Sequence, residues 1–409
     1  MATIPRILEV DPSSRLELFQ RKLQLTTFVL NFNDPTSQWR EKEIKRQELN
    51  DIINFVATQP DILSHPDLYP QIFRMVSSNL IRCLPAHSKP SNEDEEGKKV
   101  EAAWSHIELV YVFLLTCFRS SAWNPTLAIP YVSASFIREL MKLFESEDTR
   151  ERQNLKNVVH RLYYDIVPLR GYIRQQIGNS LLEYVHEKKP HCGIVELLTV
   201  LESIIDGFMS PLREEHKNFF NRVLVLLYKT PHYKQFHQQL TQCVVRFVRK
   251  DIELLFASIL KYWPKAESEK QVLLLRDIGV LLPRMPQSQI QYIILPLFRR
   301  IGLCVASEHF MTAEVALTLF SSENIIVVVA DNTHVIIPLL FGPLCYSMCG
   351  HWHYRTRAMC DSILQLFAEI DPDRFAWCTR KYQCTEGTEK EKWAILDRQA
   401  EFWFREAST

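Results

Sequence analysis

Apolar residues recur at intervals of three and four along most of the chain. Between residues 16 and 30, leucines and phenylalanines return with this spacing, and residues 39–58 repeat it after a charged start. Such spacing places the apolar side chains on one face of a helix, whereas a half-buried strand would alternate apolar and polar positions. The pattern therefore predicts amphipathic helices over residues 16–30 and 39–58.

The same periodicity predicts helices along the rest of the chain, and Pro, Gly, Asn or Asp marks nearly every junction between them. The predicted helices cover residues 72–84, 102–119, 133–145, 151–165, 170–187, 193–208, 213–228, 233–248, 251–261, 268–280, 288–303, 309–319, 323–330, 333–348, 351–369, 371–382 and 388–405. Residues 85–99 are polar and lack periodicity, so we predict an exposed loop there. Residues 385–409 are predicted to form a C-terminal helix or tail.

A pair of helices about every forty residues, without the alternation typical of strands, is the sequence signature of an α-solenoid. We therefore predict an all-α fold built from divergent helix-pair repeats of the HEAT or armadillo type. In this interpretation residues 1–409 form a single elongated α-solenoid. Such a fold offers a concave surface for extended partners and rarely encloses a catalytic pocket.

Composition narrows the classes of function. The 48 basic and 48 acidic residues balance, so no overall field recruits nucleic acid or an anionic membrane. Only 10 glycines are present, and the phosphate-binding, nucleophile-elbow and HExxH zinc motifs of common enzymes are absent from the sequence. We expect a protein that is not an enzyme, binds no cofactor and contacts no nucleic acid.

The cysteines and the apolar stretches indicate the compartment. The ten cysteines are scattered, mostly within apolar helical runs, which is typical of buried thiols in a reducing environment. The N-terminus lacks the apolar core of a signal peptide, and the uncharged stretch 335–350 is short for a bilayer and contains prolines. We expect a cytoplasmic or nuclear protein without membrane insertion.

One cluster has the composition of a metal site. Its members are Cys345, Cys349, His351, His353 and Cys360. Structural zinc sites favour paired ligands in a polar loop, whereas Cys345 and Cys349 have helical spacing among apolar residues. Core packing is therefore the favoured interpretation and no metal is expected, although zinc stays open as an alternative.

The stretch 155–217 combines aromatic and basic residues on successive predicted helices. Three pairs share a helix face by their spacing of three or four: His160 with Tyr163, Arg170 with Arg174, and Val200 with Ile204. Apolar walls with cationic ends suit an extended peptide that carries Leu or Ile and an acidic group. Spacing alone leaves the alternative open that the apolar residues are core and the arginines solvated.

Several segments, in order along the chain, resemble the B-prime regulatory subunits of protein phosphatase 2A. They are LFQRKLQLTTFVLNFNDPTSQWREKEIKRQELNDIINFV at 18–56, EAAWSHIELVYVFLL at 101–115, FIRELMKLFESEDTRERQNLKNVVHRLY at 136–163, HQQLTQCVVRFVRKD at 237–251 and ILKYWPKAESEKQVLLL at 259–275. The stretch 155–217 belongs to the same resemblance, which extends from residue 10 to about 385. It implies a non-catalytic subunit that binds the scaffold and catalytic subunits of the phosphatase.

The resemblance also implies a peptide groove, because B-prime subunits capture short motifs of the form LxxIxE between two adjacent repeats. Tyr163, Val200 and Ile204 would then form the apolar wall for the Leu and Ile of the motif. His160, Arg161 and Arg170 would face its N-terminal half and any phosphate, and Arg213 with His216 would receive its Glu. The sequence departs from the family pattern in this region: Thr199 replaces Glu, Val200 replaces Ile, Glu202 replaces Gly and Arg213 replaces Lys.

A solenoid cargo or scaffolding adaptor without a phosphatase partner is the alternative function. Armadillo-type cargo receptors usually carry regular ladders of Trp and Asn along the groove. The sequence lacks such ladders, so the phosphatase subunit is the favoured hypothesis.

Overall fold

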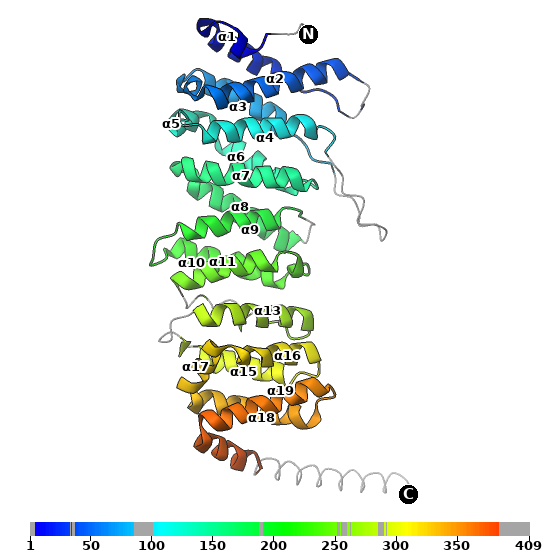
Figure 1. Ribbon diagram of the computed structural model, residues 1–409, viewed down its shortest axis with the longest axis vertical. Helices are drawn as coiled ribbons and strands as arrows, with labels where there is room; N and C mark the ends of the chain where they lie inside the picture. The colour runs from blue at the N-terminus through cyan, green and yellow to red at the C-terminus, as the bar shows by residue number, and fades with distance from the viewer. Residues whose placement is uncertain are drawn as a thin grey trace. The chain divides into compact units, whose positions relative to one another are not determined.

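The computed structural model describes residues 5–32, 34, 37–85, 101–187, 191–251, 254, 260–261, 263–284, 290–291 and 293–383. Every regular element in these ranges is helical (Figure 1). The chain divides into two compact units: unit 1 comprises Met1–Met209 and Gln238–Cys243, and unit 2 comprises Ser210–His237 and Val244–Thr409. The predicted all-α class is confirmed.

Unit 1 is a stack of helix pairs. Its helices are α1 (Arg15–Thr26), α2 (Trp39–Thr58), α3 (Leu68–Leu80), α4 (Trp104–Arg119), α5 (Pro125–Ala128), α6 (Ala134–Lys142), α7 (Thr149–Asp165), α8 (Arg170–Glu187) and α9 (Ile194–Asp206). One layer is formed by α2, α4, α7 and α9, each packed on the next, while α1 packs on α3 and α6 on α8 (Figure 1). The helices α4, α7 and α9 begin 45 residues apart, which is the repeat of the stack.

Unit 2 continues the alternation of paired helices. Its helices are α10 (Glu214–Arg222), α11 (His237–Lys250, shared with unit 1), α13 (Ser268–Leu281), α15 (Ile294–Val305), α16 (Phe310–Thr318), α17 (Glu323–Asp331), α18 (Thr333–Gly350) and α19 (Tyr354–Ile370). Here α13, α16 and α19 pack in succession, and α15 packs on α18. Each unit therefore has the predicted architecture of divergent helix-pair repeats stacked in sequence order.

The first helix ends earlier than its apolar spacing predicts. The periodicity extends to Leu30, but α1 ends at Thr26. Two side chains from neighbouring helices take carbonyl groups at and just beyond its end: Asn79 Nδ2 donates to the Thr26 carbonyl at 3.0 Å and Lys45 Nζ to the Phe28 carbonyl at 2.7 Å. Because these donors satisfy groups that a longer helix would pair internally, the helix stops. The predicted last turn is wrong, and the apolar Phe28 is left on the surface.

Other boundaries follow the predictions more closely. The helices α2 and α8 have the predicted bounds, whereas the predicted helix 213–228 breaks at Val223 into α10 and the 3₁₀-helix η7 (Leu224–Lys229). The predicted loop 85–99, apart from Pro85, lies outside the described residues, as do the tail 385–409 and most of 251–261. The single solenoid over residues 1–409 stays a prediction.

A buried ionic network joins three helices of unit 1. The guanidinium of Arg82 donates to both carboxylate oxygens of Glu151 at 2.8 Å and pairs with Glu101 at 2.9 Å. The Glu151 side chain is 0% exposed, and the Tyr111 hydroxyl donates to it at 3.3 Å. These contacts fasten the chain after α3, the start of α4 and the first turn of α7 to one another.

The helix α18 is long and apolar enough to cross a membrane by length and composition alone. Buried core helices of soluble proteins meet the same criterion. It contains Pro338 and Pro343 and packs against α15 and α19. The absence of membrane insertion stays a prediction.

Candidate peptide-binding site

The predicted groove residues of unit 1 come from α7, α8 and α9. The carboxylate of Asp148 caps the start of α7 by accepting a hydrogen bond from the Arg150 N–H at 2.9 Å. After Asp165 the chain turns through the 3₁₀-helix η6 (Val167–Leu169). Pro168 has no N–H to donate, and it is tolerated there because an N–H in the first turn of a helix has no partner within the helix. The C-terminal end of α7 and the start of α8 are therefore adjacent in the fold.

The side chain of Arg170 closes this junction. Its Nε donates to the Tyr163 carbonyl and its Nη2 to the Tyr164 carbonyl, both at 2.9 Å. Its guanidinium carbon also lies 5.4 Å from the centre of the Tyr163 ring. A cation is favourable at the negative end of a helix, so Arg170 both caps α7 and fixes the aromatic ring beside it.

A second arginine holds the same ring from its hydroxyl end. Arg174 Nη1 donates to the Tyr163 hydroxyl at 3.1 Å, and its guanidinium lies 5.9 Å from the centre of the Phe208 ring. Tyr163 is thus held in one orientation by two cations. Arg174 was not among the predicted site residues, although its spacing of four from Arg170 indicated that the two share a face.

The guanidinium of Arg161 contacts Asp165 and Tyr164. Its Nε pairs with Asp165 Oδ2 at 3.0 Å, and its guanidinium lies 5.5 Å from the centre of the Tyr164 ring. Burial raises the pKa of Asp165 above its usual value, and the charge of Arg161 offsets only part of that effect. An anionic ligand at Arg161 would have to compete with this carboxylate.

The predicted apolar wall lies in the core. Val200 is 1% and Ile204 3% exposed on α9, while His160 is exposed on α7. The carbonyl beside them, that of Leu198, accepts a hydrogen bond from Cys243 Sγ at 3.3 Å. A ligand side chain could contact Val200 or Ile204 only if the atoms that cover them moved. Their role in binding the Leu and Ile of a peptide therefore stays a prediction.

The remaining predicted residues, Arg213 and His216, belong to unit 2. Arg213 precedes α10 and its side chain is exposed, whereas His216 is buried, with its Nε2 at 3.1 Å from Glu215 Oε1. The first turn of α10 carries Glu214 as well. The predicted acceptor of a glutamate therefore has two carboxylates beside it, and its use stays a prediction.

Three members of the cysteine and histidine cluster, His351, His353 and Cys360, each have a structural role in the fold. His353 Nδ1 lies 3.2 Å from Glu314 and His351 Nδ1 accepts the His353 N–H at 3.0 Å. Cys360 is buried, and burial raises the pKa of its thiol to about 12. Within the described part of the chain, no three His, Cys, Asp or Glu side chains converge on a position that could hold a metal ion.

Comparison with known proteins identifies the relatives of this chain. Residues 4–404 match the family model described as protein phosphatase 2A regulatory B subunit (B56 family). The chain is 36% identical over 397 residues to the B' beta isoform of the 57 kDa regulatory subunit of serine/threonine protein phosphatase 2A from Arabidopsis thaliana, covering 95% of this chain and 79% of that protein. It is also 36% identical to the delta isoform of the 56 kDa regulatory subunit from Oryctolagus cuniculus (98% and 69% covered) and to the alpha isoform from Mus musculus (98% and 82% covered).

Among solved structures, the crystal structure of an engineered protein aligns with this chain at a TM-score of 0.37 and 9% sequence identity. The alignment covers 90% of this chain and 99% of the engineered protein, and the similarity is weak. The family match covers nearly the whole chain, and the relatives are identical to this chain at more than a third of the aligned positions. The chain belongs to the B56 family of protein phosphatase 2A regulatory B subunits.

Proposed function

We propose that this chain is a non-catalytic subunit that binds the scaffold and catalytic subunits of protein phosphatase 2A and brings substrates to them. The observation that carries this proposal is the family match over residues 4–404, together with relatives that are named regulatory subunits. It favours a phosphatase subunit over the cargo-adaptor alternative.

The proposed location is the cytoplasm or nucleus. No disulfide joins the cysteines that the structure describes, which is typical of proteins in a reducing compartment. Fluorescence microscopy of the tagged chain would test this location.

Substrates or adaptor proteins would be recruited through LxxIxE-like motifs at the residues around Tyr163. The ring of Tyr163, held by Arg170 and Arg174, is preorganised, so a peptide would order few side chains on binding. Family resemblance assigns the Leu and Ile of the motif to the wall with Val200 and Ile204. This part of the proposal requires a local opening of the core.

Phosphorylation near the Leu of the motif would act on Arg161. A phosphate carries a charge of about −1.5 to −2, more than the single charge of Asp165. The Arg161 side chain is 40% exposed and can be reached by a phosphate, whereas the Asp165 carboxylate that pairs with it is only 6% exposed. A phosphate would therefore compete with Asp165 for the guanidinium. Asp165→Asn should therefore strengthen the binding of a phosphorylated peptide.

Two measurements test the proposal. Co-purification from cells should recover the scaffold and catalytic subunits, and recovery of neither would contradict the assembly claim. Calorimetric titration with an LxxIxE peptide should show binding that Arg213→Ala weakens about tenfold, because a charge-assisted hydrogen bond contributes about 1.5–3 kcal/mol.

The matched control is Arg138→Ala, which removes an exposed arginine on α6 of unit 1. It should leave both peptide affinity and assembly unchanged. Equal affinity of wild type and Arg213→Ala for the LxxIxE peptide would show that the chain does not bind the motif through Arg213. This conclusion would hold whatever the outcome of the co-purification.

A further inference from the structure

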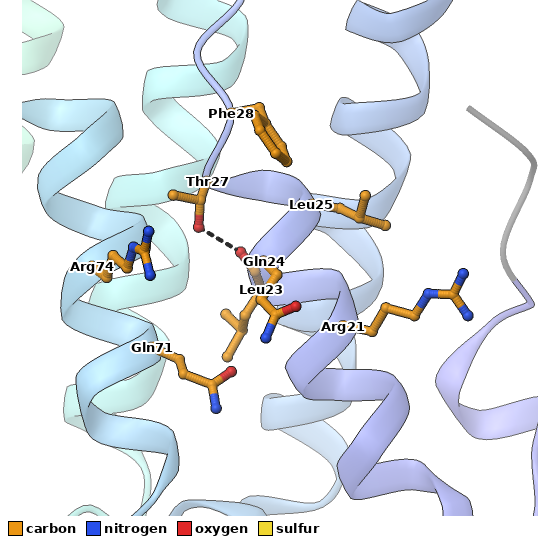
Figure 2. A pocket seen from close by; sticks show the side chains of 8 residues that line it. All are labelled: Arg21, Leu23, Gln24, Leu25, Thr27, Phe28, Gln71 and Arg74. Carbon is orange, nitrogen blue, oxygen red and sulfur yellow. Dashed lines mark hydrogen bonds between the residues drawn. The ribbon is translucent and has the colours of Figure 1, made fainter.

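A cavity of about 460 Å³ opens between α1 and α3 in unit 1, far along the chain from the predicted groove (Figure 2). It is lined by Arg21, Leu23, Gln24, Leu25, Thr27, Phe28, Gln71 and Arg74. A volume of this size is in the range of ligand-binding clefts. None of the predicted groove residues contributes to it.

Two exposed cations line this cavity. Arg74 comes from α3 and Arg21 from α1, and Figure 2 shows Arg74 on the α3 side and Arg21 extending from the opposite side of α1. Neither forms an ion pair with any described residue, and Glu17, one turn before Arg21, makes none either. The lining includes no Asp or Glu, so the cavity carries two positive charges without internal compensation.

The apolar part of the cavity is held in place. Leu23 is buried at its floor, whereas the side chain of Phe28 is 61% exposed at its rim. Phe28 follows the early end of α1, and its carbonyl is fixed by the buried ammonium of Lys45 at 2.7 Å. An exposed phenyl ring on a backbone fixed in this way is preorganised to cover an apolar side chain of a ligand.

The polar lining favours a peptide over a simple anion. The side-chain oxygen of Gln71 is buried and accepts no hydrogen bond from any described residue, while its nitrogen donates weakly to the Asp67 carbonyl at 3.4 Å. The Thr27 hydroxyl is already committed to the Leu23 carbonyl at 2.8 Å (Figure 2). An amide oxygen that awaits a donor suits the N–H of a peptide backbone, which a bare anion does not offer.

We propose that this cavity binds an extended acidic segment of a partner protein. One apolar side chain of the segment packs against the exposed ring of Phe28, carboxylates on either side of it pair with Arg21 and Arg74, and a backbone N–H donates to Gln71. This site is separate from the LxxIxE site, so it neither requires that site nor depends on it.

The probe is a fluorescein-labelled peptide of sequence EDFLDE, titrated with the full chain at low salt and followed by fluorescence anisotropy. Wild type should bind it saturably, and the charge-inverted peptide KKFLKK should not bind. The double variant Arg21→Glu/Arg74→Glu should weaken binding at least tenfold, because each attraction becomes a repulsion. Phe28→Ser should weaken it severalfold without changing the salt dependence, which reports charge.

The matched control is Arg138→Glu, which makes the same charge change on an exposed residue of α6 outside the cavity. Its affinity should stay within twofold of wild type, and circular dichroism should show that all variants remain folded. Failure of wild type to bind, retained binding in the double variant or an equal loss in Arg138→Glu would overturn the proposal. The chain assembled with phosphatase subunits should bind the probe equally well, and blocked binding would instead identify the cavity as part of an interface within the assembly.

Discussion

Replacing Arg82 with methionine would leave the carboxylate of Glu151 buried in unit 1 without its cation. The wild-type guanidinium gives Glu151 two hydrogen bonds of 2.8 Å, and after the change the 3.3 Å bond from Tyr111 remains. Burial opposes the charged form of Arg82, yet the two carboxylates raise its pKa above the usual value, so the cation is the stable form at all ordinary pH.

Breaking a buried ion pair by removing one partner costs about 3–5 kcal/mol, since the other charge stays buried without compensation. For a unit of this size, 1 kcal/mol corresponds to a shift of about 2–4 °C in melting temperature, so Arg82→Met should lower it by roughly 10 °C. Glu101→Gln should lower the free energy of unfolding much less. The Glu101 side chain is 20% exposed, so water can take the place of the lost carboxylate beside Arg82.

The assay is urea denaturation followed by tryptophan fluorescence, with Trp104 and Trp123 as reporters inside unit 1. The double variant Arg82→Met/Glu151→Met should recover much of the stability that Arg82→Met loses, since no buried charge remains. A loss below about 1 kcal/mol for Arg82→Met, or losses that simply add in the double variant, would refute this account of the network.

Three further changes test other parts of unit 1. Burial, helped by the charge of Lys45, lowers the pKa of His106 to about 4, so the unfolded chain takes up the proton first and stability should fall as pH drops from about 6.5 to 4. Thermal melts at pH 7 and pH 4.5 should show this loss in wild type and a smaller loss in His106→Gln. Burial lowers the pKa of Lys45 to about 8, so its contribution to stability should grow as pH rises from 8 towards 10.5, and urea titrations of wild type and Lys45→Met at pH 7.5 and 9.5 should differ in that direction. In Gly193→Ala the new Cβ would lie 2.4 Å from the Phe144 carbonyl oxygen, which should cost about 1–3 kcal/mol, whereas Gly171→Ala, with nothing within 4 Å, should be neutral or stabilising in the same melts.

Helix positions were largely predictable because they depend on local spacing. The bounds of α2 follow from the charged start and the apolar period of residues 39–58, and the all-α class follows from the same pattern. The end of α1 did not follow, because Asn79 and Lys45, which take the carbonyls of Thr26 and Phe28, come from helices later in the sequence. Local spacing carries no information about such distant donors.

The candidate site was less predictable than the fold. Spacing correctly placed Val200 and Ile204 on one helix face, but it does not show whether that face meets solvent or core, and the structure buries both. The sequence also shows that Arg161 carries a positive charge, but not that this charge is paired with the carboxylate of Asp165. Burial and pairing depend on tertiary packing, which a single sequence shows only by resemblance.

The ion pair between Arg82 and Glu101 has a consequence for how this family can be re-engineered. These two residues stand on either side of segment 86–100, and their side chains meet at 2.9 Å. Because their contact brings the two ends of the segment together, doubling the length of chain between them would add only about 0.6 kcal/mol of loop-closure entropy. A fluorescent reporter domain could therefore be inserted between residues 86 and 100 at little thermodynamic expense. The same insertion between α7 and α8 would pull Arg170 from the carbonyls that it caps and disturb the ring of Tyr163.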